Sequence, residues 1–131
     1  MRSACALLVA VLVVPAAALG LSAKSPISGV YTTTLKGQAE PAPDGRWTIS
    51  IAPSGRYGIY TGGLKLVTGS AKTVGKRVTF ADQGGRAACH GSRAVGIYRW
   101  RLVPGLLTLT PLSERCAGRL VVLSSRPLAR K

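Results

Sequence analysis

The residues best able to support chemistry gather in one stretch, from Asp82 to Arg119. Cys89 and His90 are adjacent, and they are the residue types that a cysteine nucleophile and its base require. Asp82, His90 and Ser92 would supply the groups of a serine triad. However, adjacent side chains of an extended segment point in opposite directions, and no serine lies in a Gly-x-Ser-x-Gly turn. We therefore predict no catalytic residues and no enzymatic activity.

Residues 1–20 have the layout of a secretory signal peptide. Arg2 supplies positive charge, residues 6–14 form a continuous apolar run, and Ala16-Ala17-Ala18 offers a cleavage site. The run is shorter than the about 20 residues that a bilayer-spanning helix needs. We expect cleavage between about Ala18 and Ala23 and a secreted chain in which residues 21–28 form a flexible leader.

Two cysteines remain once the signal peptide, which contains Cys5, is removed. An even number of cysteines in an exported chain is typical of disulfide bonding, so we predict a bond between Cys89 and Cys116. The alternatives are two free thiols or part of a metal site, and a metal site would need more ligands than these cysteines and His90. We therefore expect no metal and no cofactor.

Aromatic side chains occur at alternating positions of several expected strands: Trp47, Tyr57, Phe80, Tyr98 and Trp100. Alternation places them on one face of each strand, toward a shared interior. They would either fill that interior completely or line an apolar pocket at one mouth. They are the candidate ligand-binding residues, with the face of Tyr98 and Trp100 as the expected pocket wall.

The elements that must position these residues are short strands bounded by Gly or Pro, with no helical apolar period outside the signal peptide. The expected strands are Val30 to Lys36, Trp47 to Ile51, Arg56 to Thr61, Leu64 to Ser70, Arg77 to Phe80, Gly96 to Leu102, Leu106 to Thr110 and Arg119 to Leu123. Such spacing with short connections predicts an all-β, up-and-down antiparallel barrel of about eight strands. The barrel domain would span residues 29–126, followed by a basic tail at residues 127–131.

The chain is strongly basic, with 18 Lys and Arg residues against 4 Asp and Glu residues. This charge favours weak attraction to polyanions or anionic surfaces. The cations are scattered rather than clustered, which argues against a specific nucleic-acid site. We expect a monomer.

Three short motifs carry a family resemblance: Gly29-Val30-Tyr31, Gly96-x-Tyr98-x-Trp100 and Cys116-Ala117-Gly118-Arg119. Their order resembles that of small secreted bacterial proteins with a lipocalin-like (calycin) barrel. Lipocalins place a Gly-x-Trp on the first strand and cover the indole with an Arg of the last strand. Here Tyr31 stands at the Trp position, and Arg119 or Arg126 would be that Arg. The resemblance implies a cavity for a small apolar molecule and no catalysis.

The first functional hypothesis is therefore a secreted, non-enzymatic barrel that binds a small hydrophobic or amphipathic ligand. One alternative resembles secreted protease inhibitors, in which residues 21–27 would enter a target cleft. Another is a cationic protein of the cell envelope that contacts polyanions and has no pocket.

Overall fold

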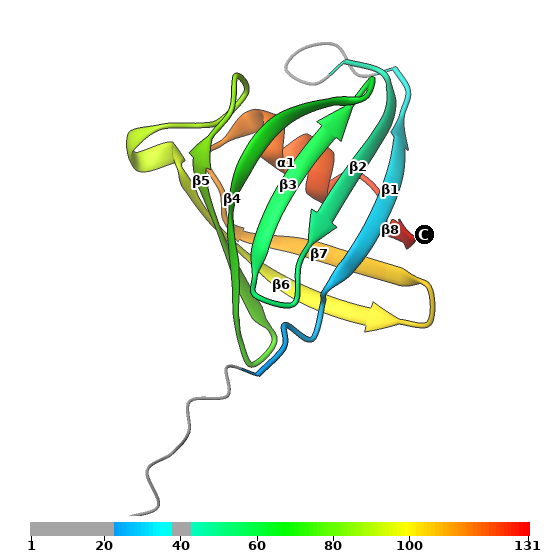
Figure 1. Cartoon of the computed structure of the whole chain (residues 1–131), viewed down its shortest axis with the longest axis vertical. Coiled ribbons are helices and arrows are strands. Elements are labelled where there is room, and N and C mark those ends of the chain that lie inside the picture. The colour runs from blue at the N-terminus through cyan, green and yellow to red at the C-terminus, as the bar shows by residue number, and fades with distance from the viewer. Residues whose placement is uncertain (1–22, 38–42) are drawn as a thin grey trace, which may run out of the picture.

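The computed structural model describes residues 23–37 and 43–131, so the predicted signal peptide lies outside the described residues. The chain forms a closed antiparallel barrel in which each strand pairs with its neighbours in sequence and β8 pairs with β1 (Figure 1). The strands are β1 (Gly29–Leu35), β2 (Gly45–Ile51), β3 (Arg56–Thr61), β4 (Leu64–Val74), β5 (Arg77–Gly84), β6 (Val95–Val103), β7 (Leu106–Ser113) and β8 (Leu128–Arg130). The prediction of an all-β, up-and-down barrel of eight strands is confirmed.

The interior of the barrel is formed by apolar side chains at alternating positions of the strands. On β2, Trp47, Ile49 and Ile51 are buried, and on β6 the buried positions include Tyr98 and Trp100. Successive side chains of a strand point to opposite faces, so each alternating segment has one apolar face directed into the barrel. The five aromatics singled out from the sequence are all at most 8% exposed.

Several strands extend beyond the predicted limits. β4 continues to Val74, β5 to Gly84 and β7 to Ser113. The additional residues of β5 include Asp82, which lies beyond the predicted strand end at Phe80. Pairing with a neighbouring strand keeps these added residues extended, because strand formation depends on cross-strand partners as well as on local composition.

The segment predicted as the last strand, Arg119 to Leu123, is instead part of α1 (Ala117–Ser124). The buried residues of α1 are Arg119, Val122 and Leu123, which have the i, i+3, i+4 spacing of one helix face. A short apolar run of Leu and Val does not distinguish a strand from a helix, and this ambiguity explains the error. A short 3₁₀ turn, η1 (Gly91–Arg93), precedes β6.

The chain closes the barrel with residues that the sequence assigned to a basic tail. Leu128 is fully buried, and β8 pairs with both β7 and β1. The guanidinium carbon of Arg130 lies 5.6 Å from the ring centroid of Tyr31. The arginine that covers the first-strand aromatic is therefore Arg130, and not Arg119 or Arg126.

The described part of the predicted flexible leader also packs against the barrel. Ile27 is fully buried, and the Tyr31 hydroxyl donates a 2.8 Å hydrogen bond to its carbonyl oxygen. The Ser25 amide donates to the Pro53 carbonyl at 2.9 Å. The domain therefore begins a few residues before β1.

Candidate ligand-binding site

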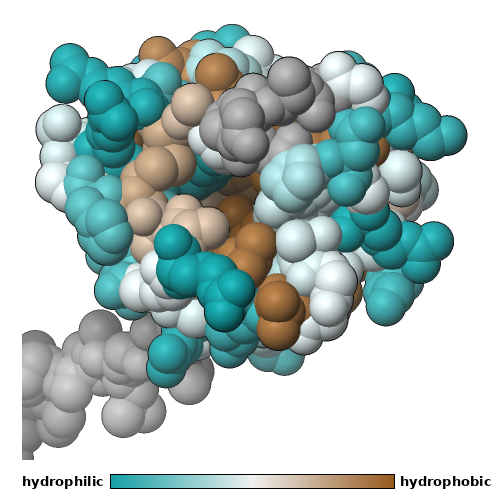
Figure 2. All heavy atoms as spheres, turned by 90° about the horizontal axis from the view of Figure 1, so that it is seen from above, coloured by the Kyte–Doolittle hydropathy of each residue, from teal (hydrophilic) through white to brown (hydrophobic). Residues whose placement is uncertain are grey.

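A cavity of about 510 Å³ opens beside α1. Seen from above, apolar atoms lie inside a hollow of this face and hydrophilic atoms surround it (Figure 2). The lining is contributed by β2 to β5, the segment before β6, the residues just before α1, and the first turns of α1. Its members are Trp47, Ile59, Leu66, Val67, Asp82, Ala87, Cys89, Arg93, Arg115, Cys116, Ala117, Gly118, Arg119 and Val122.

Trp47 is the one predicted ligand-binding aromatic that lines this cavity. The rings of Tyr57 and Phe80 meet edge to face at 5.1 Å, and those of Phe80 and Tyr98 at 5.5 Å. These three rings fill the interior and are part of the core. The sequence left two roles open for the five aromatic residues, filling the core or lining a pocket. Most of them fill the core.

Trp100 lies at the opposite end of β5 from the cavity. Its indole N–H donates a 3.1 Å hydrogen bond to the Gly75 carbonyl in the β4–β5 turn. The Lys76 ammonium lies 4.1 Å from the ring centroid, within cation–π distance. Neither Tyr98 nor Trp100, the expected pocket wall, lines this cavity.

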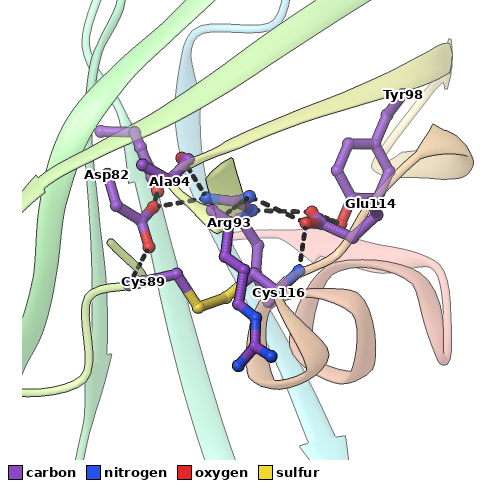
Figure 3. Close-up of a disulfide and its surroundings, with 9 residues drawn as sticks. Asp82, Cys89, Arg93, Ala94, Tyr98, Glu114 and Cys116 are labelled. Carbon is purple, nitrogen blue, oxygen red and sulfur yellow. Dashed lines mark hydrogen bonds and ion pairs between the residues drawn. A yellow bond between two sulfur atoms is a disulfide. The ribbon is translucent and has the colours of Figure 1, made fainter. Parts of the chain in front are cut away.

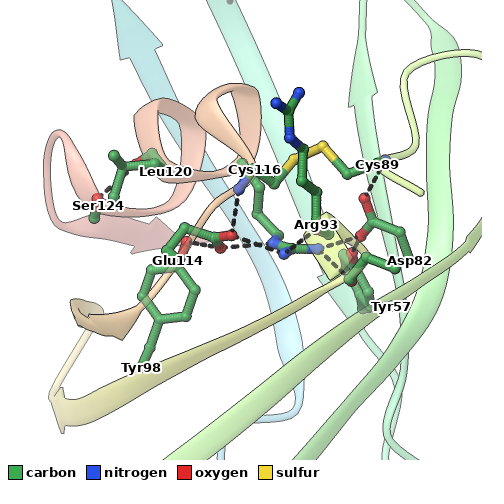
Figure 4. A network of polar contacts seen from close by, with 11 residues as sticks. Tyr57, Asp82, Cys89, Arg93, Tyr98, Glu114, Cys116, Leu120 and Ser124 are labelled. Atoms are coloured by element: carbon green, nitrogen blue, oxygen red, sulfur yellow. Dashed lines mark hydrogen bonds and ion pairs between the residues drawn. A yellow bond between two sulfur atoms is a disulfide. The ribbon is translucent and has the colours of Figure 1, made fainter. Parts of the chain in front are cut away.

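Arg119 lines the cavity and connects a network of buried polar groups. Figure 4 shows this network, with Asp82 and Glu114 labelled. Its Nε and Nη2 donate to the two oxygens of Glu114 at 2.7 and 2.8 Å. Its Nη1 donates to Asp82 and to the Ala94 carbonyl, both at 2.8 Å, and Nη2 also donates to the Arg93 carbonyl at 3.1 Å. All five guanidinium N–H groups are thus bonded, which is what a buried arginine requires.

Two core tyrosines complete the same network. The Tyr57 hydroxyl donates to Asp82, and the Tyr98 hydroxyl donates to Glu114. Burial, followed by the hydrogen bond to a carboxylate, raises the pKa of both tyrosines well above the ordinary value of 10.0. They therefore remain neutral donors at physiological pH.

The charges of the network favour ionised Glu114 and Arg119. Burial by itself raises the pKa of Glu114, but the hydrogen bonds from Arg119, Tyr98 and the Cys116 amide outweigh it and lower the pKa. Burial by itself lowers the pKa of Arg119, but its bonds to Glu114 and the negative charges of Asp82 and Glu114 raise it. Glu114 and Arg119 thus stabilise each other in their charged forms.

Gly96 is a site-forming residue that the sequence identified only through a motif. A Cβ at this position would lie 2.2 Å from a carboxylate oxygen of Glu114. The missing side chain therefore makes room for the carboxylate beside β6. A glycine among alternating strand residues is the available signal, because it often marks close approach of another group.

The predicted disulfide is confirmed, with Cys89 and Cys116 joined and their Cα atoms 6.0 Å apart (Figure 3). The Cys89 amide donates to Asp82 and the Cys116 amide to Glu114, both at 2.8 Å. The disulfide and the Arg119 network thus connect the same two segments. Both cysteines line the cavity, so the disulfide forms part of its wall.

The groups first considered for chemistry are used in other ways. The potential ligand atoms of Asp82, Cys89 and Cys116 lie within 4.8 Å of one another, but the two sulfurs are bonded to each other. Asp82 accepts hydrogen bonds from Tyr57, Cys89 and Arg119, while His90 and Ser92 are exposed. The structure does not assemble the cysteine–histidine pair or the serine triad.

Within residues 23–37 and 43–131, no helix has the length and hydropathy that a bilayer span requires. Comparison of the chain with family models, curated proteins and solved structures found no match. Functional interpretation therefore depends on the geometry of the cavity and its surroundings.

Proposed function

We propose that this protein is an exported, non-enzymatic barrel that binds a small hydrophobic or amphipathic ligand. The observation that carries the proposal is the cavity of about 510 Å³ beside α1. Pockets for small molecules are typically concave, mostly apolar and about 300–1,000 Å³ in volume. The Cys89–Cys116 disulfide supports export, since such bonds persist mainly in oxidising compartments.

The lining supports an apolar ligand rather than a substrate. Trp47, Ile59, Val67 and Val122 supply buried apolar surface, and Asp82 and Arg119 are already paired with each other. A ligand in this space would gain its affinity mainly by removing apolar area from water. Among the described lining residues, the two cysteines are joined in a disulfide and Asp82 is paired with Arg119, which supports binding rather than catalysis.

Filling the cavity tests the proposal. Ala117 is exposed and lines the cavity at the start of α1, so A117W would place an indole at its mouth. We expect wild type to bind the neutral probe N-phenyl-naphthylamine saturably, and A117W to bind it about ten-fold or more weakly. Fluorescence titration measures both affinities, and circular dichroism checks that the barrel is intact.

The matched control is S125W, which adds the same side chain to an exposed residue at the other end of α1, outside the cavity. It should bind the probe like wild type. Absence of saturable binding by folded wild type would exclude the proposed function. Equal binding by A117W and wild type would place the probe elsewhere.

A second candidate function is weak, salt-sensitive association with polyanions. Asp82 and Glu114, half of the four acidic residues, are used internally by Arg119. Arg77 and Arg99 lie directly opposite each other on β5 and β6, an arrangement of like charges that is unfavourable without a counterion. This exposed cationic face supports contact with a polyanion.

The protease-inhibitor alternative is less well supported. It requires residues 21–27 to extend into a target cleft, but Ile27 is fully buried and the Ser25 amide is bonded to Pro53. Freeing these residues would expose Ile27 and remove its hydrogen bond from Tyr31.

A further inference from the structure

Two arginines border the cavity from different segments. Arg93 belongs to η1, and Arg115 lies between β7 and α1. Both are exposed and both line the cavity. They therefore place two positive charges at the mouth of an otherwise mostly apolar space.

The guanidinium of Arg93 is not used in the buried network. Its backbone carbonyl accepts from Arg119, but its side chain extends past the disulfide and makes no marked contact with the other residues drawn (Figures 3 and 4). Asp82 and Glu114, the nearby carboxylates, have their hydrogen bonds with Arg119, the two tyrosines and the cysteine amides. Within the described residues, neither Arg93 nor Arg115 forms an ion pair.

We propose that Arg93 and Arg115 bind the anionic head group of a single-chain amphiphile whose tail occupies the cavity. Guanidinium groups suit carboxylate and phosphate oxygens because they offer paired N–H donors. The other charged lining residues, Asp82 and Arg119, are paired with each other, whereas Arg93 and Arg115 are exposed. The exposed arginines are therefore the groups that would attract an anion and orient the head group toward the mouth. Trp47, Ile59 and Val122 would then contact the tail. This inference rests on the proposed function, because it assigns the ligand class of the same cavity.

The test uses one decyl chain with different head groups: decanoate, decyl phosphate, decanol and decyltrimethylammonium. Calorimetric titration below micelle-forming concentrations gives each affinity. We expect both anions to bind wild type about ten-fold or more tightly than decanol, and the cation to bind most weakly. Comparing decanoate with decyl phosphate distinguishes a carboxylate ligand from a phosphate ligand.

The double variant R93Q/R115Q should bind the anions as weakly as decanol, while its affinity for decanol stays that of wild type. R99Q/R101Q removes the same charge from exposed positions on the outer face of β6, away from the cavity, and should retain the preference for anions. Equal loss of that preference in both double variants would overturn the inference, because overall charge would then explain it.

The outcomes separate the two proposals. If decanol binds wild type as tightly as decanoate, the head-group assignment is wrong but the apolar site remains. If no decyl compound and no neutral probe binds, the proposed function itself fails.

Discussion

Arg119 shows how a buried charge can hold a small barrel together. Its five N–H groups reach two carboxylates and two backbone carbonyls, which belong to β5, the segment before β6, and the residues before α1. A buried ion pair is not by itself strong evidence of stability, because desolvation is costly. Removing one partner is nevertheless severe, since the remaining charges stay buried.

We therefore expect R119M to lower the free energy of unfolding by about 3–5 kcal/mol. Urea denaturation at neutral pH measures the loss. The control is R126M, which removes an exposed arginine and should change stability by no more than about 0.5 kcal/mol. A loss below about 1 kcal/mol in R119M would mean that the network is dispensable.

The pH dependence of R119M provides a second readout. In wild type the folded pKa of Glu114 is lowered from 4.5, so its contribution is present above that pH and declines as pH falls through the folded pKa. In R119M burial dominates, the pKa rises, and protonation then favours the folded state. The stability difference between the proteins should shrink as pH falls from 7 toward 4. A constant difference would contradict this explanation.

The strands could be predicted because their apolar residues alternate clearly. Trp47, Ile49 and Ile51 define β2, and Tyr98 and Trp100 define β6. The disulfide followed from cysteine number. The remaining elements carry weaker local signals, because α1 is a short apolar run and β8 has only three residues.

The position and lining of the cavity could not be predicted because they depend on α1. With residues 119–123 expected as a strand, Arg119, Val122 and Ala117 had no reason to border a common space. The alternation of aromatic residues correctly indicated that their side chains lie inside the barrel. Tertiary packing decides which rings contact one another and which line the cavity. Trp47 reaches the cavity, whereas Phe80 is enclosed by Tyr57 and Tyr98.

Substitutions at neighbouring positions of β8, the strand that closes the barrel, should differ clearly in their effect on stability. Leu128 is fully buried on β8, so L128A should cost about 2–5 kcal/mol through lost packing and a residual cavity. A129S alters the exposed neighbour and should cost no more than about 0.5 kcal/mol. Urea denaturation compares them, and equal midpoints would mean that β8 is the dispensable tail expected from the sequence.

Positive and negative charges are distributed unevenly between the surface and the interior of the molecule. The net charge is +14, and the two acids nearest the cavity are buried with Arg119. Exposed cations such as Arg77, Arg99 and Arg101 therefore dominate the outer face of β5 and β6. The field around such a surface attracts anions over a distance that salt limits.

Accordingly, we expect the protein to be retained on heparin-agarose at about 0.02 M salt and released by about 0.3 M. The variant R77Q/R99Q should elute at lower salt than K24Q/R126Q, which removes the same charge from exposed residues that are not opposite each other. Elution conductivity is the measurement. Failure of wild type to bind at low salt would exclude the polyanion interaction.

The contact between Arg130 and Ser28, a 2.6 Å hydrogen bond across 102 sequence positions, has a consequence for the order of folding. Hairpins between consecutive strands close short loops, whereas joining β8 to β1 closes nearly the whole domain and costs more chain entropy. The pairing of β8 with β1 should therefore form after the hairpins. Until this pairing forms, Tyr31 and Leu128 remain exposed to water. The open sheet is therefore the folding species most prone to self-association.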